Sequence, residues 1–266
     1  MTEIIILMEN KSKYGFAKEH GLSFAIIHKG NNILFDVGAS DNFLINANKL
    51  DIGLSNFNDV VLSHSHWDHT NGLKYISDKR IIAHPAVFND MFSKRTDEYI
   101  GIPFNVDKAK QEFEVLLTEK PYEIYDDIYF LGEIPRVNDF ESQEAFYYDD
   151  EGNDDYVMSD SAVAIKTNEG IILITGCSHS GIINIMTYAK KVCKTEKIRA
   201  VIGGFHLRKL DKVAKETVKF LKNEENCIYY PMHCTTDEVI KYMKDELGNQ
   251  QVFRKIAGES IILKDV

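Results

Sequence analysis

The stretch HSHWDH at residues 64–69 decides the fold, because it places three histidines and one aspartate within six positions. It follows an apolar run at residues 60–62, which predicts a buried strand leading into it. His64 and His66 lie two residues apart, so on an extended chain their side chains point the same way and can bind one metal ion. Asp68 and His69, past a turn, can bind a second. The alternative, a polar loop with chance histidines, leaves this density of ligands unexplained.

Three more of the nine histidines follow predicted strands. His206 and His233 come in the loops directly after strands, and His179 lies shortly beyond another strand end. In α/β folds, functional groups gather at such strand ends. Neutral imidazole and carboxylate are suitable ligands for Zn²⁺, Fe²⁺ or Mn²⁺. We therefore expect a mononuclear or dinuclear metal site on the rim of a sheet.

Apolar strands and amphipathic helices are mixed along the chain, and this pattern is typical of two sheets sandwiched between helices. Turn residues at 29–32 and 167–170 each join two apolar runs and predict hairpins. The predicted strands cover residues 4–8, 22–27, 33–37, 60–62, 80–83, 162–166, 171–175, 200–202, 227–230 and 261–263. Helices are predicted over residues 41–50, from residue 73, and over 182–193, 210–223 and 236–247.

The amino-acid composition argues against some classes of function, such as non-specific nucleic-acid binding. The 266 residues carry a net charge of −10 and only four cysteines. An acidic chain is unsuited to non-specific binding of nucleic acid or anionic membrane. It remains compatible with an anionic small-molecule substrate, because a metal ion supplies local positive charge. Few cysteines, no signal peptide and no long apolar stretch indicate a cytoplasmic protein. The length suits one domain, with two small ones as the alternative. The oligomeric state stays open.

The HSHWDH stretch matches the His-x-His-x-Asp-His signature of the metallo-β-lactamase superfamily, and the chain resembles that superfamily over nearly its whole length. Asp36 matches an early aspartate that supports the metal loop, and His233 matches the last metal-binding histidine. The resemblance implies an α+β protein with a four-layer αββα sandwich, formed as a single domain over residues 1–266.

A narrower resemblance comes from GCSHSGIIN at residues 176–184, GGFHL at 203–207 and PMHCT at 231–235. These stretches look like a subgroup named 7,8-dihydropterin-6-yl-methyl-4-(β-D-ribofuranosyl)aminobenzene-5′-phosphate synthase. That activity joins a pterin-methyl diphosphate to a ribosyl-aminobenzene phosphate. The resemblance therefore implies either a transferase of this kind or a hydrolase of the wider superfamily.

The chain departs from the superfamily pattern at two places. The stretch FLGEIPR at residues 130–136 replaces the usual Gly-His-Thr turn, so the resemblance makes His179 the ligand that joins His64 and His66 at the first metal. Asp68, His69 and His233 are then expected at the second. Cys177 stands where a bridging aspartate is usual, and we place it with Asp36 as a supporting residue. The expected cofactor is one or two Zn²⁺ ions, with Fe²⁺ or Mn²⁺ as alternatives.

Further residues are expected to act on the substrate. We predict catalytic roles for Asp68 and His206, and His206 is also a candidate for binding a substrate phosphate; its alternative is a polar turn residue. Glu133 and Arg136 are predicted to face the pocket, the alternative being a surface ion pair. Residues 84–155 include an acidic, aromatic segment that suits either a lid or a solvated loop. His20, His28 and His84 are expected to be surface or structural, and Trp67 to be packing.

Two function classes follow from these expectations. The first is an enzyme of the metallo-hydrolase type that hydrolyses a phosphorylated, ester or lactone small molecule, or transfers a group with departure of diphosphate. The second is a non-catalytic metal-binding or redox-sensing module. It stays an alternative because two thiols lie beside predicted metal ligands, Cys177 near His179 and Cys234 next to His233.

Overall fold

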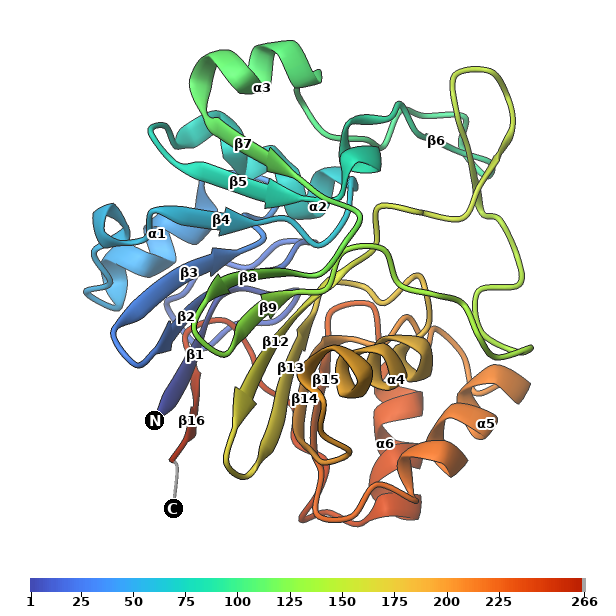
Figure 1. Cartoon of the computed structure of the whole chain (residues 1–266). Helices are drawn as coiled ribbons and strands as arrows, with labels where there is room; N and C mark the ends of the chain where they lie inside the picture. The colour runs from blue at the N-terminus through green and yellow to red at the C-terminus, as the bar shows by residue number, and fades with distance from the viewer. Residues whose placement is uncertain (265–266) are drawn as a thin grey trace. The chain divides into compact units, whose positions relative to one another are not determined.

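A computed structural model describes residues 1–264 of the chain. These residues form two compact units. Figure 1 colours the chain by residue number, from blue at the N-terminus to red at the C-terminus. Unit 1 contains residues 1–119, 145–159 and 256–264, and unit 2 contains residues 120–144 and 160–255. Each unit is described by itself below. The expectation of one domain over residues 1–266 stays a prediction.

Unit 1 is built on a seven-stranded sheet with the order β16-β1-β2-β3-β4-β5-β7. Strands β16, β1, β2 and β3 pair antiparallel, whereas β3, β4, β5 and β7 are parallel. The bounds are β1 Thr2–Met8, β2 Ser23–His28, β3 Asn31–Phe35, β4 Asp59–Val61, β5 Arg80–Ala83, β7 Glu114–Leu117 and β16 Ser260–Leu263.

Helices cover one face of this sheet. The helix α1 (Asn42–Lys49) packs against β1 and buries Phe43 and Ala47 in a core with Leu34 and Val60. The other helical elements of unit 1 are η1 Leu54–Asn56, α2 Trp67–Thr70, η2 Asn71–Tyr75, η3 Pro85–Phe88 and α3 Val106–Glu112. Ile4 and Ile6, which alternate with the core residues of β1, are also fully buried. Side chains on both faces of the sheet are therefore shielded from water.

A second, three-stranded sheet of unit 1 has the order β11-β10-β6. Its strands are β6 Phe92–Ser93, β10 Tyr147–Tyr148 and β11 Asp154–Asp155. The ring of Phe92 stacks on Tyr148 with centroids 5.4 Å apart. This small sheet lies within the segment that the sequence predicts as a lid or solvated loop, so that segment is partly ordered into strands.

Unit 2 is built on a six-stranded sheet with the order β15-β14-β13-β12-β9-β8. The bounds are β8 Tyr122–Tyr125, β9 Ile128–Phe130, β12 Ala162–Thr167, β13 Gly170–Thr175, β14 Ile198–Gly204 and β15 Ile228–Met232. Strands β13, β14 and β15 run parallel, so their carboxyl ends share one edge. The helices α4 (Ile182–Cys193), α5 (Lys212–Leu221) and α6 (Asp237–Leu247) contribute to one apolar core with β12 and β13.

Each unit thus supplies one large sheet and a set of helices, which confirms the predicted α+β class. One expectation was wrong in detail. The helix predicted from residue 73 is the short 3₁₀ segment η2, preceded by the single turn α2. At Gly72 an added Cβ would lie 2.0 Å from the Val37 carbonyl oxygen, so the chain here runs against another backbone segment. Within residues 1–264, no helix combines the length and apolar character needed to cross a membrane.

A buried carboxylate begins helix α4. The N-cap residue Gly181 has no side chain to cap the helix, and Glu141 does so instead. Its oxygens accept hydrogen bonds from the amides of Ile183 and Asn184, each at 3.0 Å, and from the side chain of Asn138 at 2.7 Å. Burial raises the pKa of Glu141, and these hydrogen bonds oppose the increase. Glu141 therefore ties the loop after β9 to the helix that follows the GCSHSG stretch.

We expect Glu141→Gln to destabilise the protein by about 1–3 kcal/mol, because the new amide N–H faces backbone donors in place of an acceptor. Urea unfolding followed by circular dichroism measures the change. Glu144→Gln, three residues away and exposed, is the matched control and should leave the midpoint unchanged. Equal midpoints for the two variants would contradict the capping role.

Candidate metal centre

The predicted ligands of unit 1 form a tight cluster beyond the end of β4. The ring centroids of His64 and His66 are 4.7 Å apart, and those of His64 and His69 are 4.2 Å apart. His64 and His69 are fully buried, and His66 is 7 % exposed. The single helical turn α2 begins at Trp67, and Thr70 donates a side-chain hydrogen bond to the carbonyl of His66 at 3.0 Å. The turn brings His69 back beside His64.

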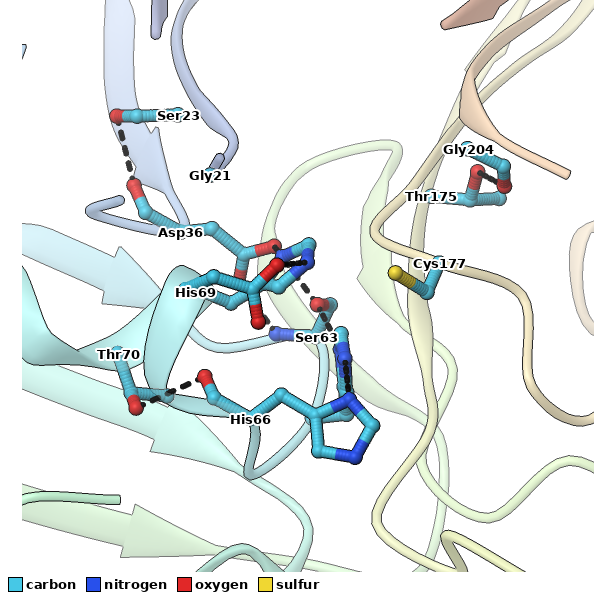
Figure 2. Close-up of polar contacts among 12 residues, drawn as sticks. Gly21, Ser23, Asp36, Ser63, His66, His69, Thr70, Thr175, Cys177 and Gly204 are labelled. Atoms are coloured by element: carbon cyan, nitrogen blue, oxygen red, sulfur yellow. Dashed lines mark hydrogen bonds and ion pairs between the residues drawn. The ribbon is translucent and has the colours of Figure 1, made fainter. Parts of the chain in front are cut away.

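Asp36 holds this cluster from one buried position directly after β3. Its carboxylate accepts hydrogen bonds from the backbone and the side chain of Ser63, at 2.8 and 2.7 Å. Its Oδ2 also lies 2.7 Å from Nδ1 of His69, as Figure 2 shows. The side chain is fully buried and the backbone has a left-handed φ of 51°, which aspartate tolerates better than most residues. These contacts are the ones expected of a residue that supports the metal-binding loop of unit 1, which is the role predicted for Asp36.

The hydrogen bonds show which ring nitrogen of His64 and of His69 carries a proton and which keeps its lone pair. A carboxylate only accepts, so Ser63 donates its hydroxyl proton to Asp36 and must accept at its 2.8 Å contact with Nδ1 of His64. Nδ1 of His69 likewise donates to Asp36. In their neutral forms, both rings then keep the lone pair on Nε2. An imidazole held by a carboxylate through its other nitrogen is the usual arrangement of a metal-binding histidine.

The donor set fits a divalent ion. Nε2 of His64 and Nδ1 of His66 are 3.1 Å apart. Two Zn–N bonds of about 2.0–2.1 Å in a tetrahedral site would put their nitrogens about 3.3 Å apart. Oδ2 of Asp68 lies 3.6 Å from Nε2 of His69, which places a carboxylate oxygen beside a second imidazole lone pair. Nitrogen and oxygen donors at these separations are those that Zn²⁺, Fe²⁺ and Mn²⁺ use.

In unit 2, the predicted residues lie beyond the carboxyl ends of the three parallel strands. His179 follows β13, His206 follows β14 and His233 follows β15. The rings of His179 and His206 are close, with centroids 4.3 Å apart. His179 and His233 are buried, and His206 is partly exposed. The structure of unit 2 therefore gathers these groups at one sheet edge, as the sequence predicts.

Two thiols accompany these histidines. The sulfur of Cys234 accepts a hydrogen bond from the amide of His206 at 3.3 Å and lies 3.5 Å from the carbonyl oxygen of Cys177. Burial by itself raises the pKa of the Cys234 thiol. Its hydrogen bond with Cys177, the neighbouring His233 and the His206 amide outweigh that effect and lower the pKa to about 6. Cys177 is buried beside it.

The loop that carries His179 is held by Asp160, which sequence reasoning missed. Asp160 accepts hydrogen bonds from the amide and the hydroxyl of Ser180, at 2.9 and 2.5 Å. Burial raises the pKa of Asp160, and the hydrogen bonds from Ser180 and His179 and the nearby charge of Arg136 oppose the increase. Asp160 stands two residues before β12, and nothing in the local sequence marks its contact with Ser180, which is 20 positions away.

The residues predicted to face the substrate also lie in unit 2. Arg136 is half-buried and donates from Nε to the hydroxyl of Ser142 at 2.9 Å. Glu133 is exposed in the loop after β9. Their roles toward a substrate stay predictions.

The structure agrees with the expectation that His20, His28 and His84 are surface or structural residues, and it corrects the one for Trp67. His28 is indeed structural, since it is buried and contacts Thr2 at 2.7 Å, and His84 caps η3. His20, however, is exposed and lies 3.3 Å from Asp68, a contact that the sequence does not reveal because the loop partners are 48 positions apart. Trp67 is 36 % exposed and is not a core residue, since α2 turns its ring outward beside His20.

The chain belongs to the metallo-β-lactamase superfamily. The family model of that superfamily matches residues 18–222. A crystal structure described as a metal-dependent hydrolase of the β-lactamase superfamily has a TM-score of 0.87 and 30 % identity, and the match covers 100 % of both chains. The superfamily binds divalent metals, often Zn²⁺. Zn²⁺-bound PqqB from Methylobacterium extorquens, at 11 % identity and a TM-score of 0.57 over 98 % of this chain and 100 % of its own, shares the fold.

Two relatives come from the archaeon Methanocaldococcus jannaschii. One is an uncharacterised protein, 36 % identical over 87 % of this chain and 90 % of its own. The other is named 7,8-dihydropterin-6-methyl-4-(β-D-ribofuranosyl)-aminobenzene-5′-phosphate synthase. It is 33 % identical over 88 % of this chain and 87 % of its own. The narrower resemblance read from the sequence is therefore confirmed.

We expect Asp36→Asn to weaken zinc binding by about 10–100-fold, the usual effect of removing a carboxylate that orients a metal-binding histidine. Asparagine tolerates the left-handed backbone, but its single acceptor oxygen cannot serve all three donors of Ser63 and His69, which use both oxygens of Asp36. Competition with a chromophoric chelator measures the affinity. Asp59→Asn is the control, because Asp59 is a buried carboxylate at the start of β4 that pairs with Arg80. Wild-type affinity in the Asp36 variant would refute the orienting role.

The lowered pKa of Cys234 predicts a thiolate in metal-free protein near neutral pH. Absorbance at 240 nm should rise with a midpoint near pH 6, whereas an unfolded cysteine titrates at about 8.5. This ionisation favours the folded state at higher pH, and the benefit is lost as pH falls through the folded value. Cys234→Ser should remove the step and Cys193→Ser should retain it, because burial raises the pKa of Cys193 to about 11. A step that survives in Cys234→Ser would contradict the assignment.

Proposed function

We propose that this protein is a metal-dependent hydrolase that acts on an anionic small molecule, with a phosphate ester, ester or lactone as the scissile group. The observation that carries the proposal is the cluster of His64, His66 and His69 fixed by Asp36. A divalent ion bound there supplies Lewis-acid polarisation of a substrate oxygen and activation of water. The relative at 30 % identity described as a metal-dependent hydrolase supports the same class.

The proposed ligands form two sets, one for each ion. His64 and His66 with His179 would hold one ion, and Asp68 and His69 with His233 the other. This assignment rests on the sequence pattern of the superfamily and on the donor geometry within each unit. Zn²⁺ is the proposed metal, and Fe²⁺ and Mn²⁺ are alternatives with the same donor preferences.

The chain's own residues have distinct roles in this proposal. Asp36 and Ser63 keep the histidine rings in the orientation that presents Nε2. His206, which is partly exposed beside His179, would donate a proton to a leaving group or bind a substrate phosphate. Arg136 is the candidate for pairing with an anionic substrate group.

A second candidate function is a synthase-like group transfer, and the relative at 33 % identity favours it. Transfer and hydrolysis would use the same residues, because both need charge on oxygen to be neutralised as a bond breaks. They differ in the acceptor. A transferase releases diphosphate only when a second, amine-bearing substrate is present, whereas a hydrolase uses water.

The test offers the full-length protein, loaded with zinc, iron(II) or manganese(II), to bis(p-nitrophenyl) phosphate, a phosphate monoester, a carboxylic ester and a lactone. We expect turnover of at least one substrate, reduced by about 100-fold or more in His66→Ala, because loss of the ion removes several kcal/mol of transition-state stabilisation.

His84→Asn is the matched control, since asparagine keeps the cap on η3 and His84 belongs to none of the proposed ligand sets. It should retain wild-type turnover. Metal-loaded protein that hydrolyses none of these substrates would contradict the hydrolase. Diphosphate release that requires both substrates of the synthase would then favour the transferase, and binding without any turnover would favour a sensing module.

A further inference from the structure

The segment that carries His20 is fixed directly to the metal motif. Leu22 donates its amide to the carbonyl of Asp68 at 3.2 Å, and it accepts from the amide of Gly38 at 3.0 Å. Residues 19–22 therefore lie between the loop after β3 and the start of α2. This placement sets the backbone of His20 beside Asp68 without contribution from the imidazole itself.

Glu19 anchors the other end of this segment. Its carboxylate accepts hydrogen bonds from the amides of Ala39 and Ser40 at 2.9 and 3.2 Å. It also accepts from the Ser40 hydroxyl at 2.5 Å and from the Asn42 side chain at 2.7 Å. Four donors on one carboxylate hold the residue next to His20 in a single position.

Gly21 shows how closely the segment approaches the motif. A Cβ at this position would lie 2.8 Å from the carbonyl oxygen of Asp68 and 3.2 Å from the amide nitrogen of Ala39. Both neighbours are backbone atoms, which cannot move aside as a flexible side chain would. Only glycine allows the chain to pass here, so the close approach is built into the sequence on the carboxyl side of His20.

The imidazoles of His20 and His69 each place a nitrogen near the same carboxylate oxygen of Asp68. Nε2 of His20 lies 3.3 Å from Oδ2 of Asp68, and Nε2 of His69 lies 3.6 Å from the same oxygen. The imidazole of His20 is 60 % exposed. An exposed ion pair contributes little to stability, so pairing with Asp68 alone does not account for so rigid an anchor. His20 and Asp68 belong to one group of side chains whose ligand atoms lie within 4.8 Å of one another. An imidazole nitrogen and a carboxylate oxygen are both donors that Zn²⁺ uses.

We propose that His20 is a ligand of the second metal ion, together with Asp68. This inference rests on the proposed function, because it concerns an ion that the proposed function requires. His20 would hold the solvent-exposed side of that ion. The chain would then have a histidine ligand upstream of the HSHWDH motif, contributed by the loop between β1 and β2.

The test compares full-length wild type with His20→Gln by titration with zinc and with cobalt(II). Glutamine keeps a polar partner for Asp68 but is a poor ligand for either ion. We expect wild type to bind two ions per chain. In His20→Gln the first ion should bind unchanged, and the second should bind at least about tenfold more weakly, the lower end of what loss of a supporting group costs. The cobalt absorption spectrum should change only at the second equivalent.

Lys18→Gln, in the same segment, is the matched control and should behave as wild type. Wild-type affinity for the second ion in His20→Gln would overturn the proposal, and so would wild-type protein that binds only one ion of either metal. If His20→Gln loses the second ion and metal-loaded wild type turns over no substrate, the ligand assignment stands and the hydrolase is refuted. The two failures are therefore distinguishable.

Discussion

The metal cluster of unit 1 depends on one buried carboxylate. Asp36 receives a backbone amide, a hydroxyl and an imidazole, and a charge that is fully buried is stable only when it is paired and hydrogen-bonded in this way. Each of these donors belongs to the HSHWDH loop or to Ser63 directly before it. The same bonds that satisfy Asp36 therefore set the ring orientation of His64 and His69, so the stability of this loop and the geometry of the site have a single origin.

Left-handed backbone recurs at the strand ends that carry the site. Asp36, Ser178, His206 and His233 have φ values of 51°, 63°, 50° and 54°, and each lies within three residues of the end of a strand. Such conformations are unfavourable for side chains with a Cβ and persist where the surroundings determine them. Here the surroundings are identifiable. Asp36 donates its amide to Val61, Ser178 donates its hydroxyl to Gly204, and the amide of His206 is held by Cys234. The sharp turn after each strand directs the following side chain toward the sheet edge.

The elements with strong hydrophobic periodicity were predictable from sequence. The ranges predicted at residues 80–83 and 182–193 match β5 and α4 at both ends. In buried strands and amphipathic helices, the spacing of the apolar residues shows both the type of element and the face that is buried. The HSHWDH ligands were predictable for a related reason, since their spacing is local. Asp160 and Cys234 act through contacts with residues 20 or more positions away, and no local pattern reports such contacts. The outward position of Trp67 was missed for a different reason, because a single helical turn that begins at this residue decides it.

The anchoring of His20 shows how a site residue is hidden from pattern reading. A histidine in a loop with no ligand spacing around it is indistinguishable in sequence from a surface residue. The neighbours of His20 fix its position in the structure. Glu19 before it accepts four hydrogen bonds, and Gly21 after it leaves no room for a Cβ. Glu19 and Gly21 are needed whatever residue lies between them, so the backbone is positioned independently of the imidazole. The position of residue 20 beside Asp68 therefore follows from its neighbours, and the imidazole adds a nitrogen 3.3 Å from the Asp68 carboxylate.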